Sequence, residues 1–399
     1  MTGRPKAKTW RIPSESHREV LVTLKSNCFN LFDFGSGNLW TFDLEGRLMG
    51  MYVDQVNYRR TLDNRFFAKS RKSGNGQTFR TVEHVSLKSA GGLIDRARSL
   101  LLFVQPRLPG ELNGYVQKIL RMDMPSLEKS GEAFSGIYLP VSVLPPDQYM
   151  SLVLQITEGC NYDQCVFCTF YSDRRFRIKP LDEIEEHIGQ VKRFFGAGLM
   201  LRKTVFLADA NALVIPQSRL LPILGSVNDL LPQFKSIYSF IDVFTGIKKS
   251  ARDFSDLKEL RLKRLYLGVE SGNSELLDLL KKPQLVSDVI VLAERIKAGG
   301  VNLGLIFLAG AGGLAFHSKH LADSVRLIES IPLSSHDLVY ISELYGNSRE
   351  YHLALEERGV PLPSRQETRR MAIEFKTAVT KVVPKGVAVP VYDIRQFFY

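Results

Sequence analysis

Short apolar runs alternate with amphipathic segments between residues 151 and 344. The runs predict buried strands, and the segments between them repeat apolar residues at helical spacing. The predicted strands are residues 151–157, 204–210, 236–244, 264–270, 301–310 and 337–344. The predicted helices are residues 180–198, 216–231, 253–261, 273–281, 286–299 and 317–330. This alternation predicts an α/β fold of parallel βαβ units, which right-handed crossovers close into a barrel or an open wound sheet.

A different pattern precedes residue 146. Residues 31–54 alternate apolar and polar positions between glycine-containing turns, which predicts successive hairpin strands. The basic segment 66–80 contains glycine and predicts a loop, and residues 90–120 predict helices broken near prolines. Pro145 and Pro146 mark a boundary. We therefore predict a basic, β-rich α+β accessory domain over 1–145, an α/β core over 146–345 and a helical extension over 346–399.

Composition and charge narrow the range of locations and binding partners that the protein could have. The chain is 44% hydrophobic and 24% charged, as expected for a protein with a sizeable core. No apolar run reaches the roughly 18 residues of a membrane span, and the first residues lack the apolar stretch of a signal peptide. We therefore expect a cytoplasmic protein with no membrane partner. The net charge is +11, and residues 1–140 hold 21 Lys or Arg against 13 Asp or Glu. This excess fits RNA or another anionic partner, although a basic surface also simply aids solubility.

Three of the four cysteines lie within nine positions, directly after the first predicted core strand. They are Cys160, Cys165 and Cys168, and such clustered thiols in a reducing compartment predict a metal site. Thiolates select zinc or iron–sulfur clusters. A structural zinc ion usually takes four protein ligands, and only Cys28 remains, in a setting typical of a buried small residue. Three ligands without a fourth favour a cluster with one open iron, and zinc stays an alternative.

The stretch GCNYDQCVFCTFY, placed after the first strand of a six-strand α/β array, resembles the radical S-adenosylmethionine (radical SAM) superfamily. The spread of motifs resembles its Elp3/coproporphyrinogen-oxidase-like branch. The sequence keeps the aromatic Phe167 and the two-residue gap before Cys168, but it has four residues rather than the usual three between Cys160 and Cys165, a CX4CX2C variant. The resemblance implies a partial (β/α)6 TIM-like barrel, a [4Fe–4S] cluster on the three cysteines, and S-adenosylmethionine (SAM) as second cofactor.

The resemblance also implies contacts to SAM. Phe167 is expected beside the adenine. The stretch TVFLADAN stands where the superfamily often has a motif that contacts the methionine amino group, which makes Asp209 and Asn211 candidates. Both could instead cap the next helix.

Further along the chain, LYLGVESGN resembles the fourth strand of the family, whose end reaches the ribose and methionine portions of SAM. Glu270 and Ser271 are the candidates there, and Ser271 could equally be a helix cap. Lys282 stands where a cation would meet the methionine carboxylate, or it is a solvated lysine at a helix end.

Other polar positions carry two interpretations each. His317 and His320 could line a substrate pocket or transfer protons, but an exposed loop before a helix explains them equally well. Asp242 and Phe244 end the third predicted core strand and would face the barrel mouth. They could contact SAM or the substrate there, or they could only cap the loop.

The resemblance thus implies an enzyme that reductively cleaves SAM at a [4Fe–4S] cluster to a 5′-deoxyadenosyl radical and starts a radical reaction. Its substrate is unknown and could be anionic, and an electron donor such as flavodoxin or ferredoxin would supply the electron. Two alternatives stay open. One is an RNA-associated binding protein with structural zinc or a structural cluster, and the other is an electron carrier whose cluster is indifferent to SAM.

Overall fold

The computed structural model describes residues 7–13, 19–74, 77–344 and 348–399. Within them the chain forms two compact units. The first contains the residues up to Val141, together with Gly189–Lys203 and Phe398–Tyr399. The second contains Ser142–Ile188 and Thr204–Phe397. No helix in this described part is both long and apolar enough to cross a membrane.

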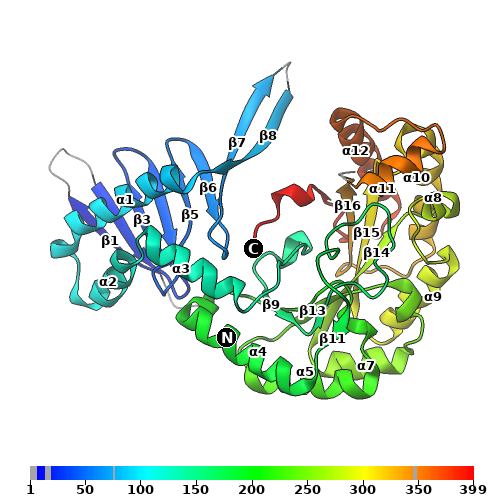
Figure 1. The fold of residues 1–399 in the computed structure, drawn as a ribbon, viewed down its shortest axis with the longest axis horizontal. Coiled ribbons are helices and arrows are strands. Elements are labelled where there is room, and N and C mark those ends of the chain that lie inside the picture. The colour runs from blue at the N-terminus through cyan, green and yellow to red at the C-terminus, as the bar shows by residue number, and fades with distance from the viewer. Residues whose placement is uncertain (1–6, 14–18, 75–76, 345–347) are drawn as a thin grey trace. The chain divides into compact units, whose positions relative to one another are not determined.

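The first unit is built on one antiparallel sheet whose eight strands follow chain order, each paired with the next (Figure 1). The strands are β1 (Lys8–Pro13), β2 (Glu19–Leu24), β3 (Phe29–Asp33), β4 (Asn38–Phe42), β5 (Leu48–Val53), β6 (Val56–Arg60), β7 (Phe66–Gly74) and β8 (Gln77–Val85). Three helices follow: α1 (Leu87–Val104), α2 (Asn113–Arg121) and α3 (Met124–Ser135). The β-rich α+β character predicted for this part is confirmed.

One feature of this sheet corrects the sequence-based expectation. The basic segment predicted as a loop forms most of β7 and β8, which pair from Phe66 opposite Val85 to Gly74 opposite Gln77. A ladder of backbone hydrogen bonds satisfies the main chain regardless of side-chain charge. The loop prediction at residues 75–76 lies outside the described residues.

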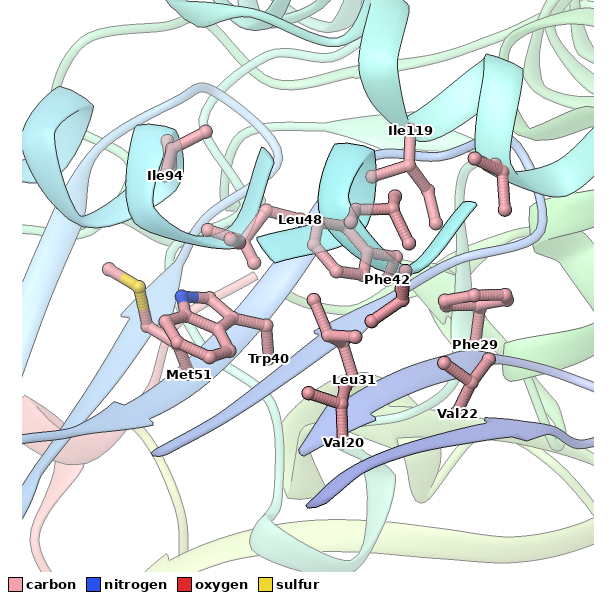
Figure 2. Packing of buried hydrophobic residues seen from close by; sticks show 14 of the residues in the cluster. Val20, Val22, Phe29, Leu31, Trp40, Phe42, Leu48, Met51, Ile94 and Ile119 are labelled. Atoms are coloured by element: carbon pink, nitrogen blue, oxygen red, sulfur yellow. The ribbon is translucent and has the colours of Figure 1, made fainter. Parts of the chain in front are cut away.

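The core of the first unit lies between one sheet face and the helices, as Figure 2 shows. Alternate strand residues such as Val20, Val22 and Trp40 point toward this layer because side chains alternate across a strand. The helix α1 completes the core with Ala90, Ile94, Ala97 and Leu101, at spacings of three and four residues that define one face. The indole Nε1 of Trp40 donates to the Leu93 carbonyl at 3.1 Å, so its polar atom is satisfied.

The second unit is a partial parallel barrel in the strand order β17-β16-β15-β14-β13-β12-β9. Its strands are β9 (Leu152–Gln155), β12 (Val205–Ala208), β13 (Ile237–Ile241), β14 (Leu262–Glu270), β15 (Asn302–Ala309), β16 (Leu338–Glu343) and β17 (Val391–Tyr392). All neighbours among them pair in parallel. The predicted (β/α)6 barrel is confirmed, and β17 adds a short seventh strand that the sequence pattern did not reveal.

Helices connect these strands. They are α4 (Leu181–Phe195), α5 (Gln217–Leu230), α6 (Val243–Gly246), α7 (Ala251–Glu259), α8 (Ser274–Leu279), α9 (Val286–Ala298), α10 (Gly313–Glu329), α11 (Arg349–Glu356) and α12 (Arg365–Val382). A two-residue ribbon of β10 (Thr157–Glu158) and β11 (Arg177–Ile178) closes the base of the long loop after β9. Residues 348–397 belong to the same unit as the barrel, and the three-part division predicted above stays a prediction.

A group of hydrogen bonds around Asp147 links the barrel strands to the segment that precedes β9. The carboxylate of Asp147 accepts hydrogen bonds from the hydroxyls of Tyr266 at 2.6 Å and Tyr340 at 2.8 Å. The guanidinium of Arg264 also donates to it at 2.9 Å. Tyr266 lies in β14 and Tyr340 in β16, so one side chain ties two strands to the segment before β9.

Candidate cofactor site

A cavity of about 200 Å³ opens at the carboxyl ends of the barrel strands. In parallel barrels these ends carry the functional groups, because the loops that follow the strands converge there. Residues from the loops after β9, β12 and β13 line it, as do residues of β14 to β17. The lining includes all three clustered cysteines and Asn161, Tyr162, Phe167, Asn211, Asp242, Phe244, Glu270, Lys282, Leu308, Ser342 and Tyr392.

The cysteine loop, residues 159–176 between β10 and β11, is held at its start and at Val166 by hydrogen bonds of its backbone. Gly159 adopts φ +71°, and its N–H donates to Asp209 Oδ2 at 3.1 Å. Glycine suits this left-handed position because it lacks a Cβ. The N–H of Val166 donates to the Leu280 carbonyl at 3.2 Å, and the Ser348 hydroxyl donates to the Val166 carbonyl. The loop between β10 and β11 is therefore tied to α8 and to the start of α11.

The three thiols border the cavity as free, partly exposed cysteines. Burial raises the pKa of Cys165 to about 12 and that of Cys168 to about 11, so both thiols are protonated at neutral pH until a metal displaces the proton. In the part of the chain that the structure describes, no three His, Cys, Asp or Glu side chains are grouped so as to hold a single metal ion.

Phe167 lies beside the thiols and packs against the apolar cluster that α8, β15 and α11 share. The structure thus brings the aromatic residue of the motif to the cavity, at the side where Leu308 of β15 also lines it.

Asp209 does not line the cavity. Its carboxylate accepts hydrogen bonds from Gln155 Nε2 at 2.9 Å, from the Gly159 N–H at 3.1 Å and from Arg174 Nη1 at 3.2 Å. Burial raises the pKa of Asp209, and the hydrogen bond from Gln155 and the charge of Arg174 oppose that rise. The predicted contact of Asp209 with a cofactor stays a prediction, and the carboxylate already anchors the cysteine loop to β9 and β12.

Asn211, two residues further on, does line the cavity and is 2% exposed. Its amide nitrogen donates to Asp242 and to Thr245 Oγ1 at 2.9 Å. Asp242 in turn caps α6 by accepting from the Thr245 N–H at 2.6 Å. The amide oxygen of Asn211 is buried without a hydrogen-bond partner among the described residues. A buried, unpaired carbonyl costs free energy, so this position fits a ligand that brings an N–H donor.

Glu270 and Lys282 form a buried ion pair in the same cavity, with Lys282 Nζ 3.0 Å from Glu270 Oε1. Burial by itself would lower the pKa of Lys282, but the nearby acidic groups together outweigh burial and raise the pKa, with the charge of Glu270 and the hydrogen bond to it prominent among them. Glu270 ends β14 in the left-handed region at φ +62°, where the pairing with β15 shifts register. That turn directs its side chain to the lysine.

Ser271 is completely buried and is absent from the cavity lining that the structure describes. Its hydroxyl lies 2.7 Å from His320 Nδ1, and it accepts from the Asn273 N–H at 2.9 Å. Burial lowers the pKa of His320 to about 4, so the ring is neutral and its Nε2–H donates to the Leu308 carbonyl at 3.1 Å. The histidine therefore joins the turn after β14 to β15. His317 instead pairs with Glu374 at 2.7 Å, and neither histidine is part of the described lining.

Several lining residues escaped the sequence-based prediction. Asn161 and Tyr162 lie inside the long cysteine gap, and Tyr162 packs edge-on against Phe244 with ring centroids 5.5 Å apart. Tyr392 reaches the cavity from β17. Proximity to the cysteines could have indicated the first two, whereas a two-residue strand leaves no periodic signal for the third.

Comparison with known proteins identifies the class. Residues 154–323 match the family model described as "Radical SAM superfamily". The chain therefore carries a radical SAM domain, as the cysteine motif predicted, and the cofactors of this class are a [4Fe–4S] cluster and SAM.

Individual relatives are distant. The heme chaperone HemW of Bacillus subtilis (strain 168) is 23% identical over 236 residues, which cover 58% of this chain and 60% of that protein. The match therefore spans less than two thirds of the length of HemW. Among solved structures, coproporphyrinogen III oxidase (HemN) from Escherichia coli has a TM-score of 0.41 and 17% identity, covering 58% of this chain and 52% of that one. Elp3 of Methanocaldococcus infernus has a TM-score of 0.37 and 17% identity, covering 52% and 50%.

Proposed function

We propose that this protein is a radical SAM enzyme that reductively cleaves SAM to a 5′-deoxyadenosyl radical and starts a radical reaction on a substrate still to be identified. The observation that carries the proposal is the convergence of three thiols and a set of polar groups on one cavity at the carboxyl ends of the barrel strands. When bound, the reduced cluster supplies the electron that breaks a carbon–sulfur bond of the sulfonium.

In this proposal Cys160, Cys165 and Cys168 are the cluster ligands. A cluster held by three thiolates leaves one iron for a non-protein ligand. Neither the remaining cysteine nor a histidine belongs to the described lining, which supports that assignment. The hydrogen bonds that hold the loop at Gly159 and Val166 would keep the three thiols in place as the cluster assembles.

The polar lining supports a set of SAM contacts. The unpaired amide oxygen of Asn211 would accept a hydrogen bond from the methionine amino group, and Lys282 would meet the methionine carboxylate. Glu270 would orient Lys282 and face the ribose, and Phe167 would lie along the adenine. We assign Asp209 and Ser271 to positioning, because their side chains hold the cysteine loop and the turn after β14.

The substrate would enter beside the aromatic residues Tyr162, Phe244 and Tyr392. Lys282 is the only lysine or arginine in the lining that the structure describes, and Glu270 already pairs with it. That arrangement gives little support to an anionic substrate group inside the cavity. We keep a reduced flavodoxin or ferredoxin as the electron donor and the cytoplasm as the location.

The test is anaerobic reconstitution with iron and sulfide, followed by electron paramagnetic resonance of the reduced protein with and without SAM. We expect a [4Fe–4S] signal that SAM perturbs, and 5′-deoxyadenosine after reduction. Single alanine substitutions of Cys160, Cys165 or Cys168 should abolish both, and Cys28→Ala is the matched control that should retain both. A protein that retains only zinc would fit the RNA-associated alternative, and a cluster signal indifferent to SAM would fit an electron carrier.

A further inference from the structure

The antiparallel sheet of the first unit has a second face, opposite the one that the helices α1 to α3 cover (Figure 1). Side chains alternate across each strand, so the neighbours of the core residues point to this second face. The strand registers place them opposite one another in a single cross-strand row. In order, the row is Arg11, Leu21, Phe32, Leu39, Tyr52, Asn57 and Lys69.

The centre of this row, which we call the open-face row, is apolar and accessible. Tyr52 is 41% exposed, and Phe34, just beyond the end of β3, is 48% exposed. The rings of Phe32 and Phe34 meet edge-on with centroids 4.8 Å apart. Directly opposed strand residues lie about 5 Å apart, so Leu21, Phe32, Leu39 and Tyr52 follow one another as an apolar strip with two aromatic rings.

Cations border the strip. Arg11 begins the row, 3.7 Å from Glu19, and Lys69 ends it with its Nζ 4.6 Å from the ring centre of Phe398. In the adjacent row, Arg59 lies across Gly50, where a methyl group would come 3.3 Å from its Cδ. Arg59 is exposed and makes no ion pair within the described part of the chain.

Carboxylates are nearly missing from the same surface. Among the described residues at open-face strand positions, Glu19 is the only acid, and Arg11 already lies beside it. The remaining polar positions are neutral, for example Asn30, Thr41 and Asn57. The face therefore combines exposed aromatic rings, uncharged hydrogen-bonding groups and the exposed guanidinium of Arg59, which has no ion-pair partner among the described residues.

We propose that the open-face row binds single-stranded nucleic acid. Bases stack on exposed aromatic side chains regardless of sequence, and phosphates pair with cations at the border of the strip. A second copy of the chain fits less well, because an isologous contact would bring like charges together. This proposal is independent of SAM cleavage and does not name the enzyme's substrate.

The test is fluorescence anisotropy of the full chain, without reconstitution, with fluorescein-labelled 12-nucleotide oligo(U) RNA and oligo(dT) DNA. We expect binding to both or to one, weakening as salt increases. Tyr52→Ser and Arg59→Gln should each weaken binding about 5-fold or more, in line with the loss of a stacked base or a phosphate contact. The matched controls are Leu102→Ser and Arg121→Gln, exposed positions on α1 and α2 that should bind as the unaltered protein does.

Four results would overturn the proposal. They are no binding of either oligonucleotide, equal losses in the control variants, equally tight binding of a 12-base-pair duplex, and self-association that Tyr52→Ser abolishes. The last result would assign the face to a second copy. Because SAM cleavage is measured separately, failure of this proposal leaves the proposed function standing, and the reverse also holds. A difference between the RNA and DNA arms identifies which strand chemistry the face prefers.

Discussion

At the residue scale, the ion pair of Glu270 and Lys282 compensates two buried charges and also orients a cation in the cavity. Both side chains are buried to about nine tenths, with 8% and 12% of their side-chain surfaces exposed. Each ion compensates the charge of the other inside the cavity. This pairing keeps the Lys282 ammonium charged and holds it at the cavity wall. Because a buried charge is tolerated only with its partner, the pair should be sensitive to the loss of either member.

Lys282→Met should lower the free energy of unfolding by about 3 to 5 kcal/mol, since it leaves the Glu270 carboxylate buried and unpaired. Urea denaturation monitored by circular dichroism measures this change. The double variant Lys282→Met, Glu270→Gln should recover part of the loss, because the stranded charge is removed. Equal stability of the single variant and the unaltered protein would contradict the assigned pairing.

Two buried histidines predict how stability depends on pH. Burial lowers the pKa of both His187 and His320 to about 4, whereas an unfolded histidine titrates near 6.5. Their contribution to stability is therefore present above about pH 6.5 and is lost progressively as the pH falls toward 4, because the unfolded state binds protons first.

We expect the free energy of unfolding to fall by several kcal/mol between pH 7 and pH 4.5, on the order of 1.4 kcal/mol per unit of pKa shift for each histidine. Urea titrations at successive pH values measure it. His320→Asn should flatten the dependence, and His336→Asn, at an exposed position, serves as its control. An identical slope in the His320 variant would contradict the role given to burial.

At the scale of elements, the site depends on how loops leave the strands. The cysteine loop begins at Gly159 in a left-handed conformation, and an added Cβ there would lie 3.1 Å from the backbone of Arg175. Asp209 and Leu280 then hold the loop through backbone N–H groups. The loop is therefore positioned by its surroundings before any cofactor arrives.

Gly159→Ala should cost about 1 to 2 kcal/mol in stability through the strained φ, and it should reduce the iron bound per chain after reconstitution. Iron and sulfide assays together with denaturation measure both effects. Gly225→Ala is the matched control, because a methyl group there meets nothing within 4 Å. Full iron loading in the Gly159 variant would show that the loop tolerates displacement.

The sequence was sufficient to predict the elements of the barrel, because each strand is a buried apolar run and each main helix carries a clear apolar face. It also grouped the cysteines, Phe167, Asn211, Glu270 and Lys282 at one site, and all of them line one cavity. The cysteines, Phe167, Asn211 and Glu270 follow or end barrel strands, and Lys282 follows α8. The sequence could not show which of Asn211 and Asp209 lines the cavity, because that depends on the direction in which each side chain points. It also could not reveal Tyr392, whose position depends on a pairing between distant segments.

At the scale of the whole molecule, the chain does not complete one unit before it begins the other. Residues Gly189–Lys203 belong to the first unit although α4 begins in the second, and Phe398–Tyr399 return to the first unit at the end. Within that unit, Arg47 pairs with Asp43 at 2.7 Å and donates to the carbonyls of Phe194 and Phe195. The inserted segment therefore satisfies a buried guanidinium.

A fragment of residues 7–141 should be markedly less stable than the same unit in the full chain, because Arg47 loses two carbonyl acceptors, each worth on the order of 1.5 to 3 kcal/mol when bound to a charged group. Both tryptophans lie in this fragment, so their fluorescence during urea denaturation reports on this unit alone. A transition at the same urea concentration in fragment and full chain would contradict the expectation.

The buried position of Cys28, 7% exposed in the first unit, has a practical consequence for chemical labelling. A thiol reagent reaches the three cysteines at the cavity but is kept from Cys28 by the packing around it. If the three are cluster ligands, loading should render the folded protein inert to the reagent. The number of labelled thiols per molecule would then report cofactor occupancy, without spectroscopy and without knowledge of the substrate.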